Sequence, residues 1–338
     1  MIRYDYTRAA TLEAAATGAA RNGAKVIAGG TNLVDLLKYD VERPAHLVDI
    51  TRLPGLDRIE ATAAGGLRIG ALVSNSDVAY SAEVEQRYPL LSLTILNGAT
   101  PQLRNAATTG GNLLQRTRCY YFYDVATACN KRAPGTGCDA IGGVNRIHAI
   151  LGASPSCIAT HPSDMCVALA ALDATVHVQG PQAERSIAFA DFHRLPGDAP
   201  ERDTTLEPGE IVTAVELPAQ GYATHYTYLK LRDRLSYAFA LVSVAAGLEM
   251  DGGVVKRARI ALGGVAHKPW RVPEAEALLE GEAPGEEVFR RVAARLLEDA
   301  VGQGHNDFKV PLATKAIIRA LQQAAAGTPQ SVSDKRIA

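Results

Sequence analysis

The spacing of apolar and polar positions changes twice along the chain and predicts three parts. The first part predicts a helix over 11–21, a strand over 25–27, a glycine turn over 28–32, a helix from Leu33 and a strand over 46–50. The second predicts strands over 67–71 and 211–217, with helices over 74–80 and 88–96. The third alternates over 224–231 and 257–262, is apolar over 236–248, and becomes amphipathic over 273–279, 286–299 and 313–325. We expect an α+β fold with parts 1–55, 56–220 and 221–327 and a loose tail over 328–338.

One segment, 113–164, shows neither a sustained helical period nor a sustained strand period. It holds four of the five cysteines, namely Cys119, Cys129, Cys138 and Cys157. A segment this long without regular structure indicates function or disorder. Because thiols rarely cluster in a solvated tail, we interpret them as the ligands that fold the loop. Cys166 lies outside the set, in a predicted helix, and is expected to be a small buried residue.

The ligand chemistry leaves several alternatives open. Four sulfurs suit an iron–sulfur cluster or zinc. The spacing lacks the close cysteine pairs of common zinc ribbons and ferredoxins. Five cations in or near the loop favour a buried anionic cluster over disulfides; they are Arg116, Arg118, Lys131, Arg132 and Arg146. Zinc, disulfides and free thiols remain alternatives, and His148 and His161 are either structural or functional.

Two further stretches are rich in glycine and small polar residues. Residues 28–32 connect a strand to a helix, where backbone N–H groups can approach a phosphate. They match neither standard nucleotide motif, so a plain turn is the alternative. Residues 97–112 suit a polar ligand lying along the backbone, with an ordinary loop as the alternative.

Composition excludes several classes of protein. The 338 residues carry 35 Lys and Arg against 36 Asp and Glu, which gives no argument for a nucleic acid or an anionic membrane as partner. No apolar run reaches the roughly 18 residues that a membrane span needs. Five cysteines are too few for a disulfide scaffold. The N-terminus shows no charged region followed by an apolar one, so we expect no secretion signal on this chain.

Three motifs in order, residues 28–33, 104–112 and 162–164, resemble the FAD-binding subunits of the xanthine dehydrogenase and carbon monoxide dehydrogenase family of molybdenum hydroxylases. The cysteine segment is similar to that of the periplasmic aldehyde oxidoreductases and, less closely, to that of 4-hydroxybenzoyl-CoA reductase, which hold a [4Fe-4S] cluster. The resemblance implies a FAD-binding domain of the PCMH type, made of two α/β subdomains, and a C-terminal α+β domain of the carbon monoxide dehydrogenase flavoprotein type.

The same resemblance implies roles for individual residues. The pyrophosphate of FAD would be wrapped by Val26, Ile27, Ala28, Gly29, Gly30, Thr31, Asn32 and Leu33. The second wall would be Thr108, Gly111 and Asn112. Asp164 would hydrogen-bond the cofactor, with Lys230 near the flavin and Val212 as a minor apolar contact; a solvated strand-end lysine is the alternative for Lys230. The [4Fe-4S] ligands would be Cys119, Cys129, Cys138 and Cys157.

The function implied is electron transfer within a molybdenum-dependent aldehyde oxidoreductase. A large molybdenum cofactor subunit would oxidise the aldehyde, a small [2Fe-2S] subunit would relay electrons, and FAD here would pass them to an external acceptor. The alternatives are a xanthine dehydrogenase-like or 4-hydroxybenzoyl-CoA reductase-like FAD subunit, a self-contained FAD reductase and a zinc-stapled scaffold. We expect export to the periplasm with a signal-bearing partner, or else a complex that stays in the cytoplasm.

Overall fold

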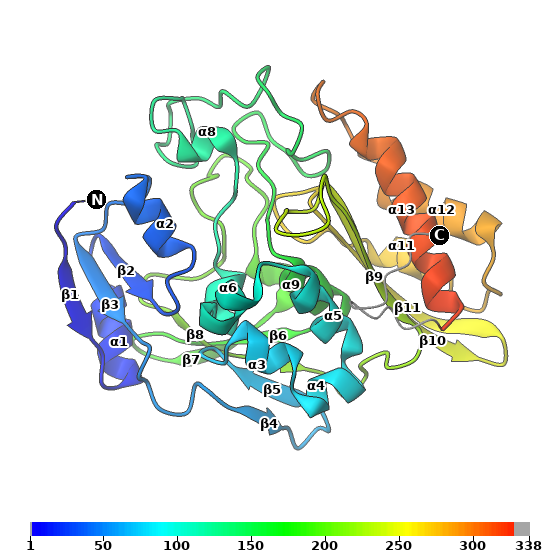
Figure 1. The fold of residues 1–338 in the computed structure, drawn as a ribbon, viewed down its shortest axis with the longest axis horizontal. Helices are drawn as coiled ribbons and strands as arrows, with labels where there is room; N and C mark the ends of the chain where they lie inside the picture. Colours follow the sequence, from blue (N-terminus) through cyan, green and yellow to red (C-terminus); the bar gives the residue numbers. More distant parts are fainter. Residues whose placement is uncertain (1, 328–338) are drawn as a thin grey trace.

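The structure, a computed structural model, describes residues 2–327. It begins with a small parallel sheet of order β1-β3-β2, at the left of Figure 1. The elements are β1 (Asp5–Arg8), α1 (Leu12–Ala19), β2 (Ala24–Ile27), α2 (Leu33–Lys38) and β3 (His46–Asp49). The side chain of Thr11 accepts a hydrogen bond from the N–H of Ala14 and begins α1. The order predicted over 11–50 is confirmed, and β1 adds one strand that the pattern did not indicate.

A five-stranded antiparallel sheet of order β4-β5-β8-β6-β7 forms the second part. Its strands are β4 (Ile59–Ala61), β5 (Leu67–Gly70), β6 (Thr175–Gln179), β7 (Glu184–Ala188) and β8 (Ile211–Leu217). Its helices are α3 (Asn75–Ala79), α4 (Ala82–Arg87), α5 (Pro89–Asn97), α6 (Pro101–Ala106), α7 (Thr109–Leu113), α9 (Asp164–Ala171) and α10 (Phe189–Phe192). The strand β5 precedes the cysteine loop in sequence and pairs with β8, which follows it. The cysteine loop is therefore an insertion between elements of the same sheet.

Residues 97–112 are not the ordinary loop given as the alternative, since they contain α6 and α7. Thr100 and Thr108 each accept a backbone hydrogen bond at the start of these helices, and Pro101 occupies the first turn of α6. Helices of six and five residues are too short to show a hydrophobic period. The capping residues, rather than a hydrophobic pattern, were the signal in the sequence that indicated these two helices.

The cysteine loop rises from the sheets at the top of Figure 1 and is irregular apart from α8 (Tyr120–Tyr123). It has a small core of its own. Phe122, Ile158 and three of the cysteines are buried there together with Leu36 from α2. The predicted absence of a sustained period is confirmed, and contact with α2 ties the loop to the first part of the chain.

The third part is an antiparallel sheet of order β11-β10-β9 covered by helices, at the right of Figure 1. Its elements are β9 (Tyr226–Leu231), β10 (Val242–Asp251), β11 (Val254–Gly263), α11 (Pro273–Ala277), α12 (Glu286–Leu296) and α13 (Lys309–Ala325). The predicted order of strands followed by helices is confirmed. The tail predicted over 328–338 lies outside the described residues. Within 2–327, no helix is both long and apolar enough to cross a membrane.

Candidate functional site

The first predicted FAD turn lies against the second. Val26 and Ile27 end β2, residues 28–32 form the turn, and Leu33 begins α2. A Cβ atom on Gly29 would overlap the carbonyl oxygen of Ala106, so the turn packs on the backbone just before α7. Gly30 has φ +71°, which favours glycine. The backbone conformation therefore favours glycine at this position independently of the predicted approach to phosphate.

The second turn is fixed by side-chain hydrogen bonds. The hydroxyl of Thr108 accepts from the N–H of Gly111 at 3.2 Å, and Gly111 leaves no room for a larger residue, since a Cβ would lie 2.9 Å from that oxygen. Asn112 donates to Oδ1 of Asn75 at 2.7 Å and accepts from the hydroxyl of Ser163. These contacts link α7 to the start of α9, where Asp164 lies.

Asp164 and Lys230 form a nearly buried ion pair. Oδ2 of Asp164 is 2.8 Å from Nζ of Lys230, and the side chains are 10% and 2% exposed. The hydroxyl of Tyr228 donates to the other oxygen of Asp164. Lys230 is therefore no solvated strand-end lysine. Val212, at 3% exposure, belongs to the core beneath the five-stranded sheet; its contact with the cofactor stays a prediction.

One amide in the first turn has an unfilled hydrogen-bonding position. Oδ1 of Asn32 accepts from the N–H of Arg116 at 2.9 Å. Nδ2 of Asn32 is buried and has no partner among the described residues. Leaving a buried donor unpaired is costly, so native proteins pair such groups. A phosphate or sugar oxygen of FAD has the acceptor chemistry that this donor needs.

The four cysteines of the loop gather in one buried region. All are free thiols, and Cys119, Cys129 and Cys157 are 4–6% exposed, with Cys138 packed against them. Burial raises the pKa of Cys119 to about 12 and that of Cys157 to about 11. Disulfides are absent among these residues. Cys166 is a fully buried residue of α9, as predicted.

The separation of the sulfurs distinguishes between metals. Zinc binds sulfur at about 2.3 Å, so four ligands of one zinc ion lie roughly 4 Å apart. Among residues 2–327, no three of these cysteines have their sulfurs within 4.8 Å of one another. The four thiols are therefore not arranged around a single zinc position. A four-iron cluster separates its thiolates further, because each binds a different iron, and four thiols are the donor set that such a cluster takes.

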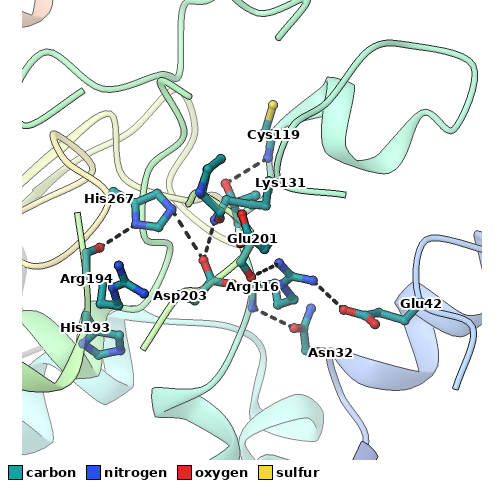
Figure 2. Close-up of polar contacts among 12 residues, drawn as sticks. Asn32, Glu42, Arg116, Cys119, Lys131, His193, Arg194, Glu201, Asp203 and His267 are labelled. Atoms are coloured by element: carbon teal, nitrogen blue, oxygen red, sulfur yellow. Dashed lines mark hydrogen bonds and ion pairs between the residues drawn. The ribbon is translucent and has the colours of Figure 1, made fainter. Parts of the chain in front are cut away.

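A carboxylate that the sequence analysis missed holds the loop in place (Figure 2). Asp203 lies 2.8 Å from Nε of Arg116 and 2.5 Å from Nζ of Lys131, a side chain with 1% exposure, and 3.5 Å from Nε2 of His267. Burial opposes ionisation of Asp203, but Lys131 and Arg116 outweigh it and hold its pKa well below the usual range. Arg116 also pairs with Glu42 at 2.5 Å.

These contacts correct one interpretation. Residues 198–208, a polar segment with no predicted helix or strand, supply the anion that the loop packs around. The loop cations do not form an unpaired positive shell around the thiols. Arg118 and Arg146 pair with Asp35 and Asp233, and Arg132 donates to backbone carbonyls. Lys131 does act on a sulfur, since its charge lowers the pKa of Cys157 against the larger effect of burial.

The two histidines singled out by sequence differ in surroundings. Nε2 of His148 is 3.0 Å from Sγ of Cys119. His161 instead packs its ring on that of His193, with centroids 4.3 Å apart, next to Cys166. Burial lowers the pKa of all three histidines, so each ring is neutral at pH 7. No local pattern separated His148 from His161.

Comparison with known proteins agrees with this arrangement. Residues 2–220 match the family model described as the FAD binding domain in molybdopterin dehydrogenase. Residues 226–324 match the CO dehydrogenase flavoprotein C-terminal domain. The chain is 51% identical over 328 residues to the aldehyde oxidoreductase FAD-binding subunit PaoB of Escherichia coli, covering 96% of this chain and 99% of the relative.

More distant relatives share the fold along most of their length. The glyceraldehyde dehydrogenase medium chain of Sulfolobus acidocaldarius is 28% identical, with 87% of this chain and 86% of the relative covered. A solved carbon monoxide dehydrogenase from Hydrogenophaga pseudoflava superimposes with a TM-score of 0.75 at 27% identity, covering 96% of this chain and 99% of the other. The chain thus belongs to the FAD-binding medium subunits of the molybdenum hydroxylase family.

Proposed function

We propose that this chain is the electron-transfer subunit of a molybdenum-dependent aldehyde oxidoreductase. FAD lies between the turns 26–33 and 108–112, and a [4Fe-4S] cluster is bound by Cys119, Cys129, Cys138 and Cys157. Support comes from the 51% identity to an aldehyde oxidoreductase FAD-binding subunit and from four gathered free thiols. When bound, the two groups supply electron transfer, and the protein positions and tunes them.

The observation that carries the proposal is the connection of both sites through Arg116. Its backbone N–H holds the side chain of Asn32 in the FAD turn. Its guanidinium pairs with Asp203, which also binds Lys131 in the cysteine loop. A FAD turn and a thiol cluster built around one shared residue are expected of a subunit whose two redox groups lie near each other.

The partners follow from the same reading. Several relatives are named medium chains, which implies larger and smaller subunits. We assign substrate oxidation to a large molybdenum subunit and electron relay to a small [2Fe-2S] subunit, with an external acceptor beyond FAD. In this chain, the buried pair of Asp164 and Lys230 would orient the cofactor, and Val212 would contact it.

The test uses the complex purified without oxygen. FAD should approach one per chain, and iron and acid-labile sulfide should approach four each, as the proposed cluster requires. An aldehyde should bleach the flavin absorption in the complex and leave that of the isolated chain unchanged. Flavin without iron would contradict the cluster. Zinc without iron would show that the thiols bind zinc instead. Bleaching in the isolated chain would indicate a self-contained enzyme.

Localisation is a separate proposal. The cluster needs reducing conditions during assembly, which favours cytoplasmic maturation. We propose that the folded chain is then exported bound to the small partner, which bears a twin-arginine signal. Fractionation of cells that express the whole complex, with and without the N-terminus of that partner, tests this. If the chain stays in the cytoplasm in both cases, the export proposal is wrong.

A further inference from the structure

One nitrogen of His148 faces a proposed cluster ligand inside the protein. Nε2 of His148 lies 3.0 Å from Sγ of Cys119, and the two residues are 1% and 6% exposed. Water therefore does not compete for this contact. Backbone groups also act on the loop sulfurs: the N–H of Ala159 lies 3.4 Å from Sγ of Cys157, and the backbone of Tyr121 and Phe122 acts on Cys119. No side-chain substitution removes these backbone donors.

The position of His148 is set from outside the loop. Its carbonyl oxygen accepts from Nζ of Lys309 at 2.8 Å and from Nδ2 of Asn306 at 3.1 Å. Its own N–H donates to the carbonyl of Asn145 at 2.9 Å. Lys309 and Asn306 are fully buried at the start of α13. The C-terminal domain therefore fixes the backbone from which the imidazole points to the sulfur.

The surroundings also determine which nitrogen carries the proton. Nδ1 of His148 is buried and makes no hydrogen bond of normal geometry among residues 2–327, although the carbonyl of Asn145 lies near enough to act on the ring. A metal-bound thiolate carries no proton of its own, so the 3.0 Å contact is favourable only when Nε2 carries one. The proton of a neutral ring therefore belongs on Nε2, where a metal-bound thiolate is an acceptor. A hydrogen bond from Nε2–H to Sγ of Cys119 results.

We propose that His148 is a positioning residue that donates this hydrogen bond to the Cys119 thiolate and thereby raises the reduction potential of the cluster. The inference rests on the proposed [4Fe-4S] cluster. Reduction adds negative charge to the cluster and its sulfurs, and a donor to sulfur stabilises the reduced form more than the oxidised form. Loss of the donor should lower the potential without removing a ligand.

The experiment is a redox titration of the cluster, followed by electron paramagnetic resonance in the assembled complex. His148→Leu should reduce the ratio of reduced to oxidised cluster about tenfold at a fixed potential, a shift of about 59 mV for a one-electron couple. His148→Gln keeps an N–H donor and should stay near the wild-type potential. His305→Leu is the matched control, because His305 is exposed and its ring hydrogen-bonds the carbonyl of Gly143 in the loop rather than a sulfur.

Iron and sulfide are measured first in every variant. Wild-type complex without iron would overturn the cluster proposal, and this inference with it. Iron in the wild type and in His148→Leu with equal potentials would overturn the role of His148 alone. If His148→Leu loses iron, His148→Gln decides: iron with wild-type potential supports the donor, whereas loss of iron in both variants shows a role in folding instead.

Discussion

The backbone N–H of Arg116 donates to Oδ1 of Asn32 over 2.9 Å, although 84 positions separate the two residues in sequence. The hydrogen bond joins the start of the cysteine loop to the turn expected to hold FAD. Because Arg116 contributes its backbone here, substitution of its side chain leaves this bond in place. It breaks the ion pairs to Glu42 and Asp203 and the contacts with the carbonyl of Glu201 and the ring of Phe122. The two sites can thus be perturbed separately.

Gly30→Val should lower the FAD content and leave iron unchanged. A valine at φ +71° is strained, and its Cβ would lie 3.1 Å from the side chain of Val34. Such strain is worth about 1–2 kcal/mol, which weakens FAD binding roughly tenfold if the turn distorts. FAD per chain is measured after dialysis. Gly55→Val is the control, because Gly55 has φ +79° and open space around it. Equal FAD loss in both variants would contradict the placement of FAD.

Cys119→Ser should remove the iron, and Cys166→Ala should leave it unchanged. Cys119 lies among the loop thiols, whereas Cys166 lies in α9. Metal binding stabilises the fold of its ligand loop, so loss of a ligand should also increase proteolysis within 113–164. Iron analysis and mass mapping of protease cuts are the measurements. Full iron in Cys119→Ser would remove that residue from the ligand set.

Asp203→Asn should destabilise the chain by about 3 kcal/mol, because Lys131 would be left as a buried cation without its carboxylate and Arg116 would lose one of its two carboxylate partners. Chemical denaturation measures the free energy of unfolding. Asp198→Asn, at an exposed position of the same segment, is the control. Since the pKa of Asp203 is lowered in the folded state, the wild-type advantage should be complete above about pH 4 and decline in stronger acid. An advantage that grows in acid would contradict the ion-pair assignment.

Lys309 should make stability depend on pH. Burial lowers its pKa to about 7, and the nearby charge of Arg146 adds to the effect. An unfolded lysine titrates near about 10.4, so between pH 7 and 10 the unfolded chain binds more protons and stability rises with pH. Lys309→Met removes this group. The wild-type free energy of unfolding, minus that of the variant, should increase from pH 7 to pH 9; a constant difference would contradict the lowered pKa.

Periodicity located elements that bury one face, such as α12, which begins at Glu286 as predicted and buries Val288, Val292 and Leu296. Ile211–Leu217 forms β8 at the predicted bounds although most of its residues are buried, because a short apolar run also indicates a strand. The thiols were predicted as one group because they lie in a single segment, so local chain closure brings them together. Short helices such as α6 and α7 show no hydrophobic period, so these helices were not predicted although their capping residues are present in the sequence.

Contacts between distant segments were not predictable from local pattern. Arg116 and Asp203 are 87 positions apart, and nothing in residues 198–208 marks one acid among several polar residues. The same holds for His148, because the side chains that hold its backbone carbonyl, Lys309 and Asn306, lie about 160 positions later in the sequence. The grouping of the four thiols was therefore readable from sequence, but the residues that position them were not.

The anchoring of residue 148 by α13 has a consequence for biosynthesis. The ribosome releases α13 after the cysteine loop, because the helix begins at Lys309. Until Lys309 and Asn306 emerge, the loop lacks contacts that hold its closing segment. Delivery of iron to the thiols should therefore follow the release of α13, and a nascent chain arrested before α13 should carry no iron.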